Sequence, residues 1–176
     1  MIETKDLILR KAQFEDWQDM YRNVWSREET ARYMLWTVTA SEEEAMERMR
    51  RTIRFQSEHD SWTVFEKASG KAIGWAGVNP IAEGVYEDGS VALGPEFVGK
   101  GYGKQILTAL TEYVFCGLEA TAFVATCRNE NAPSRGTILS CGFVYTHSED
   151  RIDPRNDLPY VLEFYRREND SLQRKG

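Results

Sequence analysis

The chain has 176 residues, 41% of them hydrophobic and 12% aromatic, which predicts one packed domain over residues 1–176 and excludes a disordered chain. The formal net charge of −6 argues against nucleic-acid binding, which needs a basic face, and is compatible with a cationic substrate such as an amine. No apolar run approaches the roughly 18 residues of a membrane span, and the first ten residues lack the apolar stretch of a signal peptide. We therefore expect a cytoplasmic protein that has no membrane partner.

The first half of the sequence predicts a strand, helices and a hairpin. Residues 6–11 alternate as a first strand does, and residues 14–25 place apolar side chains at helical spacing. Ser41 and Glu44 form a capping box, which predicts a long helix from residue 41 to the high 50s. The runs SWTVFE and KAIGWAGV, separated by KASG, predict a hairpin whose second strand ends at Pro80, because proline cannot donate to a sheet ladder.

The second half predicts helices alternating with strands. EGVYEDG is interpreted as a loop before the short strand SVAL, and the apolar spacing after it predicts a helix that begins at Gly103. TAFVATC predicts a strand, and Asn131 caps a helix that stops at Gly142. FVYTH and YVLEFYRR predict two closing strands around a polar loop, SEDRIDPRNDLP. The order of elements predicts a mixed α/β fold with a single sheet.

The cysteines and histidines do not form a recognisable metal or redox motif. Cys116, Cys127 and Cys141 lack CxxC spacing, and we expect buried free thiols. His59 and His147 lie far apart without ligands at suitable spacing. We expect no metal.

The run GPEFVGKGYGKQIL, residues 94–107, favours phosphate binding, because its glycines leave the main chain open to a close ligand. Gly94–Lys100 fits the start of a P-loop, but Gly101 stands where that motif needs a magnesium-binding Ser or Thr. The dinucleotide fingerprint requires glycine at position 104 and finds lysine. Neither motif is complete, and a P-loop nucleotide-binding module stays a rival interpretation.

The same run resembles the acetyl-CoA loop of the GCN5-related N-acetyltransferase (GNAT) superfamily, whose signature is Gln/Arg-x-x-Gly-x-Gly/Ala. Residues 98–103 match it at Gly101 and Gly103, while Val98 replaces the usual Gln or Arg. Together with LILRKAQFEDW, GWAGV and NENAPSRGTILSCGF, the resemblance covers residues 5–166 and is greatest to the ribosomal-protein N-terminal acetyltransferase (RimJ/RimL-like) branch. It implies a mostly antiparallel central sheet of about seven strands flanked by helices.

The resemblance also implies acetyl-CoA as co-substrate, held at the glycine loop. A loop that turns directly into a helix exposes unpaired amides where the helix dipole is positive, which suits a pyrophosphate. The lysines of the loop either add charge toward the phosphates or are simply solvated. The expected cofactor-binding residues are Val91, Ala92, Leu93, Val98, Gly99, Lys100, Gly101, Tyr102, Gly103, Lys104, Asn131 and Ser134.

By the same resemblance, strand 90–93 splays from strand 122–126, and a main-chain N–H at Val91, Ala92 or Leu93 polarises the thioester carbonyl. Many relatives protonate the departing thiolate with a tyrosine, which residues 134–141 lack. The Asn131 and Ser134 pattern of the ribosomal-protein branch makes these two the candidate catalytic residues, with Ser134 as proton donor. In the alternative interpretation Asn131 merely caps the helix and Ser134 fills its first turn.

The predicted function is transfer of an acetyl group to a primary amine, either a protein N-terminus or a small molecule, by direct attack in a ternary complex. A catalytically idle acetyl-CoA sensor is the second rival.

The general base stays unassigned among Glu83, Glu87, Glu96, His147 and Glu163. Substrate recognition is expected from the first helices and from loop 149–159, and the aromatic residues that either wall a pocket or belong to the core are Trp25, Tyr33, Trp36 and Trp75. The chain is expected to be a monomer or a homodimer.

Overall fold

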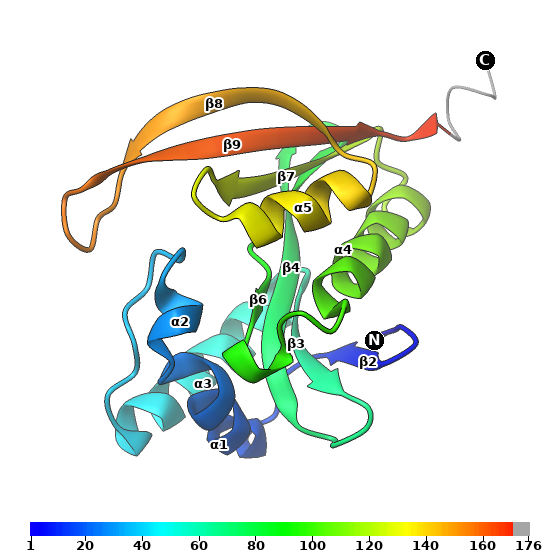
Figure 1. Cartoon of the computed structure of the whole chain (residues 1–176). Coiled ribbons are helices and arrows are strands. Elements are labelled where there is room, and N and C mark those ends of the chain that lie inside the picture. Colours follow the sequence, from blue (N-terminus) through cyan, green and yellow to red (C-terminus); the bar gives the residue numbers. More distant parts are fainter. Residues whose placement is uncertain (171–176) are drawn as a thin grey trace.

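The computed structural model describes residues 1–170 and is organised around one open, nine-stranded sheet (Figure 1). The strands are β1 Ile2–Glu3, β2 Leu7–Arg10, β3 Ser61–Glu66, β4 Ala72–Ala82, β5 Val85–Asp88, β6 Ala92–Leu93, β7 Ala122–Arg128, β8 Val144–Ile152 and β9 Pro159–Glu168. The helices are α1 Trp17–Met20, α2 Glu28–Ala31, α3 Glu42–Glu58, α4 Tyr102–Glu112 and α5 Ala132–Ser140. Short 3₁₀ turns cover Phe14–Asp16 and Pro95–Phe97, and π-helical turns cover Tyr21–Trp25 and Tyr113–Gly117.

The sheet order is β1-β2-β3-β4-β5-β7-β9-β8, with β6 paired to β4 beside this path. Neighbouring strands are antiparallel except β5 and β7, which are parallel. The predicted mixed α/β fold with a mostly antiparallel sheet is therefore confirmed. The count exceeds the expected seven because β1 has only two residues and β5 lies in a segment that was expected to be a loop.

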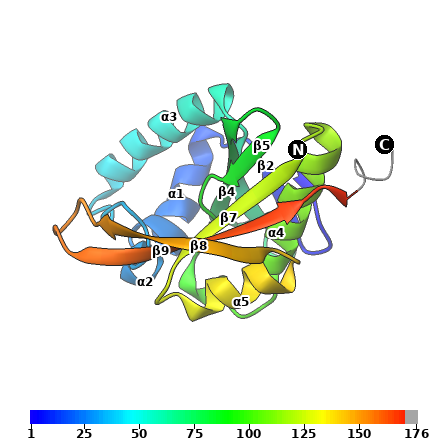
Figure 2. The ribbon, with the colours of Figure 1, turned by 90° about the horizontal axis from the view of Figure 1, so that it is seen from above.

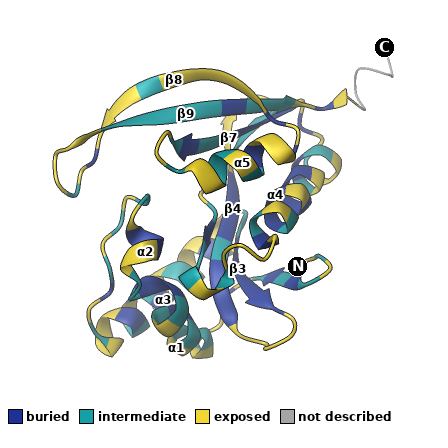
Figure 3. Cartoon of the chain, viewed as in Figure 1, coloured by how far each residue is buried: buried dark blue, intermediate teal, exposed yellow. Residues whose placement is uncertain are grey.

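Helices cover both faces of the sheet. Figure 2 shows α1 and α3 on one side of β4, β5 and β7, and α4 and α5 on the other. The larger core lies under α4 and α5 and includes Ile106, Leu110 and Phe123, which are fully buried. A second core, around Met20, Trp25 and Met49, lies under α1 and α3. Burial is greatest in the central strands and least along β8 (Figure 3).

The predicted N-terminal caps of α3 and α5 are confirmed. The Ser41 side chain accepts the N–H of Glu44 at 3.2 Å, and Glu44 returns a bond to the N–H of Ala40 at 2.8 Å, one residue earlier than the motif implies. Asn131 caps α5, which ends before Gly142 with φ +81°. Helix α4 begins at Tyr102 after an N-cap at Gly101, so the expected start at Gly103 is wrong by one residue.

Four predicted assignments are wrong because sheet pairing overrides local signals. EGVYEDG, expected as a loop, contains β5, and SVAL contributes only the two residues of β6. Strand β4 continues past Pro80, which pairs with Tyr86. The N–H of Val78 donates toward β3, and by alternation the missing N–H of Pro80 faces the same side, beyond the last β3 pair at Ser61. Strand β8 extends to Ile152, into the expected polar loop, because it pairs along most of β9.

Candidate functional site

The glycine loop enters α4 through two residues in the left-handed region. Gly99 has φ +78° and Gly101 has φ +79°, and a Cβ built at either meets no atom within 4 Å. The two glycines are therefore needed for backbone conformation, and the space beside them is open. At the start of α4, the N–H of Gln105 bonds to the C=O of Gly101 at 3.2 Å. The amides of Tyr102, Gly103 and Lys104 precede this bond and lie at the positive end of the helix dipole.

The side chains of the loop differ in whether they could contact a bound phosphate. Lys100 Nζ lies 3.3 Å from Glu66 Oε1, which also accepts the hydroxyl of Tyr102 at 2.8 Å. A half-exposed pair of this kind contributes at most about 1 kcal/mol, so a phosphate can compete for Lys100. Lys104 is exposed. Val98 is extended and 59% exposed.

Gly103 lies inside the first turn of α4, not in the open loop. A Cβ there would make ordinary contact with Thr137 of α5 at 3.6 Å. Its role in the structure is close packing of the two helices, which positions the start of α4 beside the middle of α5.

The strands next to this loop separate where the resemblance implies. β5 pairs with β7 from Val85 to Glu87, after which β6 pairs with β4 and not with β7 within residues 1–170. Gly94 N–H donates to Ile73 C=O on β4 at 2.8 Å, and Leu93 is registered with Gly74. Because N–H groups alternate in direction along a strand, that of Leu93 points away from β4, toward the side of β7. Of the three predicted donors, Leu93 therefore has the suitable direction, Ala92 is directed to β4, and Val91 lies outside the paired strand.

Two carboxylates end β5 on opposite faces of the sheet. Asp88 is registered with the buried Val78, and its Oδ1 accepts the N–H of Thr126 on β7 at 3.1 Å. Burial raises the pKa of Asp88 to about 7, although the Thr126 hydrogen bond opposes the rise. Glu87 is on the other face, opposite Asn79, and burial raises its pKa as well. Both groups gain affinity for a proton at the point where the strands separate.

Asn131 and Ser134 occupy the first turn of α5 as expected, with Asn131 Oδ1 accepting the N–H of Ser134 at 3.2 Å. The Ser134 hydroxyl bonds to the Cys127 thiol on β7, whose pKa is raised to about 11 chiefly by burial. Cys127 Sγ also lies 4.0 Å from Glu163 Oε2. The capping interpretation of Asn131 therefore holds, and Ser134 lies beside β7 with its hydroxyl turned toward the sheet.

Of the other base candidates, three are already paired. Arg135 and Tyr165 bond to Glu163 at 2.9 and 2.7 Å, and although burial would raise its pKa, these bonds hold the pKa below the usual value. Glu96 forms an ion pair with Arg27. His147 stacks on Phe164 and lies 3.3 Å from Glu149. Glu83 is exposed in the turn before β5. Glu87 is the half-buried candidate that lies beside the strand separation.

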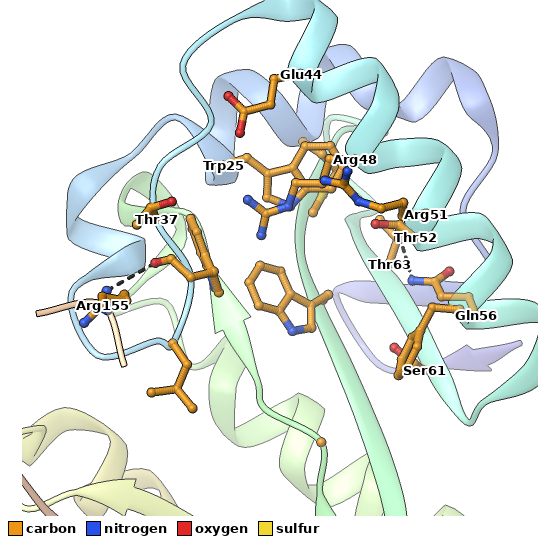
Figure 4. A pocket seen from close by; sticks show the side chains of 16 residues that line it. Trp25, Thr37, Glu44, Arg48, Arg51, Thr52, Gln56, Ser61, Thr63 and Arg155 are labelled. Carbon is orange, nitrogen blue, oxygen red and sulfur yellow. Dashed lines mark hydrogen bonds between the residues drawn. The ribbon is translucent and has the colours of Figure 1, made fainter. Parts of the chain in front are cut away.

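A cavity of about 560 Å³ opens on the α1 and α3 face of the sheet (Figure 4). Three of the four predicted aromatic residues line it, Trp25, Trp36 and Trp75, and Gly89 lines it at the strand separation. Tyr33 does not line it and stacks against Arg32 instead. Arg155, from the tip of the β8–β9 hairpin, also lines the cavity, so both segments expected to recognise substrate contribute.

Sequence reasoning missed two residues of this region. Asp88 was included in a loop, and its contact with Thr126 arises only when β5 and β7 pair. Arg48 lines the cavity from α3, but as one of several arginines on an amphipathic helix it carries no distinguishing signal. Cys116 is exposed, which contradicts the expectation of three buried thiols.

Residues 1–170 show neither a cluster of metal-binding side chains nor a membrane-spanning helix. They contain no cluster of three or more His, Cys, Asp or Glu side chains that could hold a metal ion. No helix in the same part of the chain is long and apolar enough to cross a bilayer.

Comparison with known proteins places this geometry in one family. The model of the acetyltransferase (GNAT) domain matches residues 6–144. An uncharacterised N-acetyltransferase, p20, of Bacillus licheniformis is 27% identical over 146 residues, 80% of each chain.

Solved structures agree in fold. A GNAT-family acetyltransferase from Bacillus anthracis superposes with a TM-score of 0.83 at 20% identity, covering 96% of this chain and 98% of its own. A chain from Vibrio cholerae, described as a candidate ribosomal-protein-serine acetyltransferase, gives 0.76 at 22% identity, covering 95% and 96%. The family match extends over most of the chain and includes the glycine loop, the strand separation and α5. The chain therefore belongs to the GNAT family of acetyltransferases.

Proposed function

We propose that this protein transfers the acetyl group of acetyl-CoA to a primary amine, bound together with the donor in a ternary complex. The proposal rests on the glycine loop. Gly99 and Gly101 have left-handed backbone conformations with free space beside them, and they precede the first amides of α4. Within residues 1–170, the neighbouring strand β6 pairs with β4 on one edge only. Converging amides at a helix start suit the diphosphate of coenzyme A. The open strand edge next to them suits its extended arm.

Acetyl-CoA supplies an activated thioester, and the chain supplies groups for each step of the transfer. The N–H of Leu93 is directed to the strand gap, where it can stabilise the oxyanion that develops as the amine nitrogen attacks the carbonyl carbon. Glu87, with its raised pKa, accepts the proton that the amine loses. Ser134 delivers a proton to the sulfur as the C–S bond breaks, directly or through water. If Glu87 is the base, Glu87→Gln lowers kcat at least tenfold without changing acetyl-CoA affinity.

The acceptor amine is proposed to enter the cavity on the α1 and α3 face. Its wall at Gly89 lies at the strand separation, whereas α4 and α5 occupy the opposite face. Donor and acceptor thus approach the gap from opposite sides, as direct attack requires. An α-amine, with a pKa near 7.7–8.0, needs less help from a base than a lysine side chain near 10.4.

The proposal can be tested by titrating acetyl-CoA into wild-type protein and two glycine variants in a calorimeter. Gly101→Ala forces an L-residue into the left-handed region, which costs about 1–2 kcal/mol of stability or distorts the loop. Gly70→Ala is the matched control, because Gly70 has φ +68°, an equally open Cβ position and lies in the β3–β4 turn. We expect a loss of acetyl-CoA affinity of at least tenfold in Gly101→Ala and less than twofold in Gly70→Ala.

Equal affinity in the two variants would contradict the role of the loop. Preference for ATP with magnesium over acetyl-CoA would favour the P-loop interpretation instead. Tight acetyl-CoA binding without thiol release across a broad amine panel would favour the sensor.

A further inference from the structure

The acceptor cavity holds a partly buried cation, Arg48, that forms no ion pair within residues 1–170. Resting on the proposed function, we propose that Arg48 makes this cavity specific for amines that carry an anionic oxygen group, a carboxylate or a phosphate.

Arg48 is held in place by aromatic rings and one hydroxyl. Its guanidinium lies 4.9 Å from the ring centre of Trp25 and 4.4 Å from that of Trp36, and it donates to Thr39 Oγ1 at 3.0 Å. Burial lowers its pKa to about 10, so the group stays charged at neutral pH. Within residues 1–170, no carboxylate oxygen lies at ion-pair distance from it.

Most of the other partly buried arginines have such a partner, whereas Arg167 donates to the C=O of Cys141 at 2.7 Å and forms no ion pair within residues 1–170. Arg10 is 2.9 Å from Asp16, Arg135 is 2.9 Å from Glu163, and Asp153 pairs with Arg128 and Arg155 at 2.8 and 2.7 Å. Buried charges are normally paired, because removing an ion from water is costly. The absence of a partner for Arg48, in a cavity open to ligand, points to a partner that arrives with the substrate.

The charges around the cavity agree with an anionic ligand. Arg51 stands one turn further along α3 (Figure 4). Glu44, also of α3, already accepts the N–H of Ala40 at 2.8 Å, and Arg155 is neutralised by Asp153. Glu44 keeps its charge and attracts Arg48, but Arg48 and Arg51 together outnumber it, so the lining is locally positive although the chain carries −6 overall. A polyamine would meet repulsion from Arg48 and Arg51, so this inference favours an acidic acceptor over the cationic one expected from net charge.

The tryptophans of the cavity favour an acceptor with a flat apolar group between its amine and its anionic group. Trp36 and Trp75 lie 5.6 Å apart, tilted by 54°, and line the cavity with Trp25. Trp36 Nε1 is buried without an acceptor, so a small rotation of this ring would gain a hydrogen bond to a bound anion. A cavity of about 560 Å³ accommodates an aromatic amine with an acidic group several bonds away.

A purely structural role for Arg48 makes a different prediction. If Arg48 only braces Thr39 and the tryptophans, its loss should weaken every acceptor alike. If it binds an anion, the loss should be selective for acidic acceptors.

The test compares three acceptors of one shape, 4-(aminomethyl)benzoate, 4-(aminomethyl)phenyl phosphate and 4-(aminomethyl)benzamide, with spermidine as the cationic arm. Thiol release gives kcat/KM for wild type, Arg48→Gln, Arg48→Lys and Arg54→Gln. Arg54 is an exposed arginine of α3 that does not line the cavity and serves as the matched control. Thermal melts verify that each variant folds.

We expect wild type to prefer at least one acidic compound to the amide by tenfold or more, with the carboxylate and phosphate arms distinguishing the two sources of charge. Arg48→Gln should lose at least tenfold on that compound and less than threefold on the amide, Arg48→Lys should recover part of the loss, and Arg54→Gln should match wild type. Equal losses on all acceptors, or spermidine as the best acceptor, would overturn the inference.

Binding is measured separately from turnover through tryptophan fluorescence, because three tryptophans line the cavity. Saturable, Arg48-dependent binding of an acidic compound in the presence of CoA, without thiol release, would support the inference and contradict the proposed function. Acetylation of the amide with no preference for the acidic compounds would support the proposed function and contradict the inference. No saturable binding of either acidic compound at 10 mM would also overturn the inference.

Discussion

Asp88→Asn should stabilise the protein at alkaline pH, because it removes a carboxylate whose ionisation the fold disfavours. The pKa of Asp88 is about 7 against an ordinary value of 3.8, and a rise of roughly three pH units at about 1.4 kcal/mol each is at most about 4 kcal/mol. An asparagine oxygen can still accept the N–H of Thr126. The substitution therefore removes the charge and retains the hydrogen bond.

The sign follows from proton binding. Between pH 4 and pH 7 the folded state holds a proton on Asp88 that the unfolded state has released, so the free energy of unfolding falls as the pH rises. The contribution is fully present below pH 4 and is lost through pH 7. From pH 5 to pH 8 the wild type should lose up to about 3 kcal/mol that Asp88→Asn does not lose, or about 5–10 °C in melting temperature.

Urea unfolding of wild type and variant at pH 5, 6, 7 and 8 measures this difference. Asp88→Ala is the control: it also removes the charge, but leaves Thr126 N–H without its acceptor, and should be less stable than Asp88→Asn at every pH by about 1–3 kcal/mol. Parallel stability profiles for wild type and Asp88→Asn between pH 5 and pH 8 would refute the reasoning.

Gly74→Ala should disrupt the strand separation, since a Cβ at Gly74 would lie 2.1 Å from the carbonyl oxygen of Ala92; we expect a loss above about 2 kcal/mol, and an unchanged urea midpoint would show that β6 tolerates displacement. Asp153→Ala leaves Arg155 without its buried partner and should cost about 3–5 kcal/mol. The pKa of Asp153 is held below its usual value first by Arg155, so this stability should be fully present above pH 4 and be lost on acidification, which an acid titration followed by circular dichroism checks. Ser134→Ala should lower kcat for thiol release at least tenfold with acetyl-CoA affinity retained, and an unaltered rate and pH profile would exclude Ser134 as proton donor.

Helices and strands could be predicted from the sequence where the signal for them lies within a few residues. The Ser41 cap begins α3, Asn131 begins α5, and the strand-like run of residues 61–66 gives β3 with the expected bounds. These features depend on one side chain bonding to a nearby amide or on a pattern of burial along one strand. The family resemblance, now confirmed by the domain match, rested on the same kind of contiguous run.

Pairing across the chain decided what local signals could not. Pro80 and the EGVYEDG segment were misassigned because whether they join the sheet depends on strands elsewhere, β3 ending opposite Gly77 and β7 arriving beside β5. The same holds for Asp88, whose pKa is raised only once the folded sheet buries its carboxyl group. No sequence pattern marks such a residue, because desolvation is a property of the packed structure.

The sequence by itself determined the helix starts, the central apolar strands and the open main chain at Gly99 and Gly101, since each depends on residue type and short-range geometry. Tertiary structure alone decided which backbone N–H faces the strand gap, which carboxylates are desolvated there, and that Arg48 lies against two tryptophans without an ion pair to any carboxylate of residues 1–170. Those properties depend on distances between residues far apart in the chain, and such distances are fixed only when the sheet and its helices pack together.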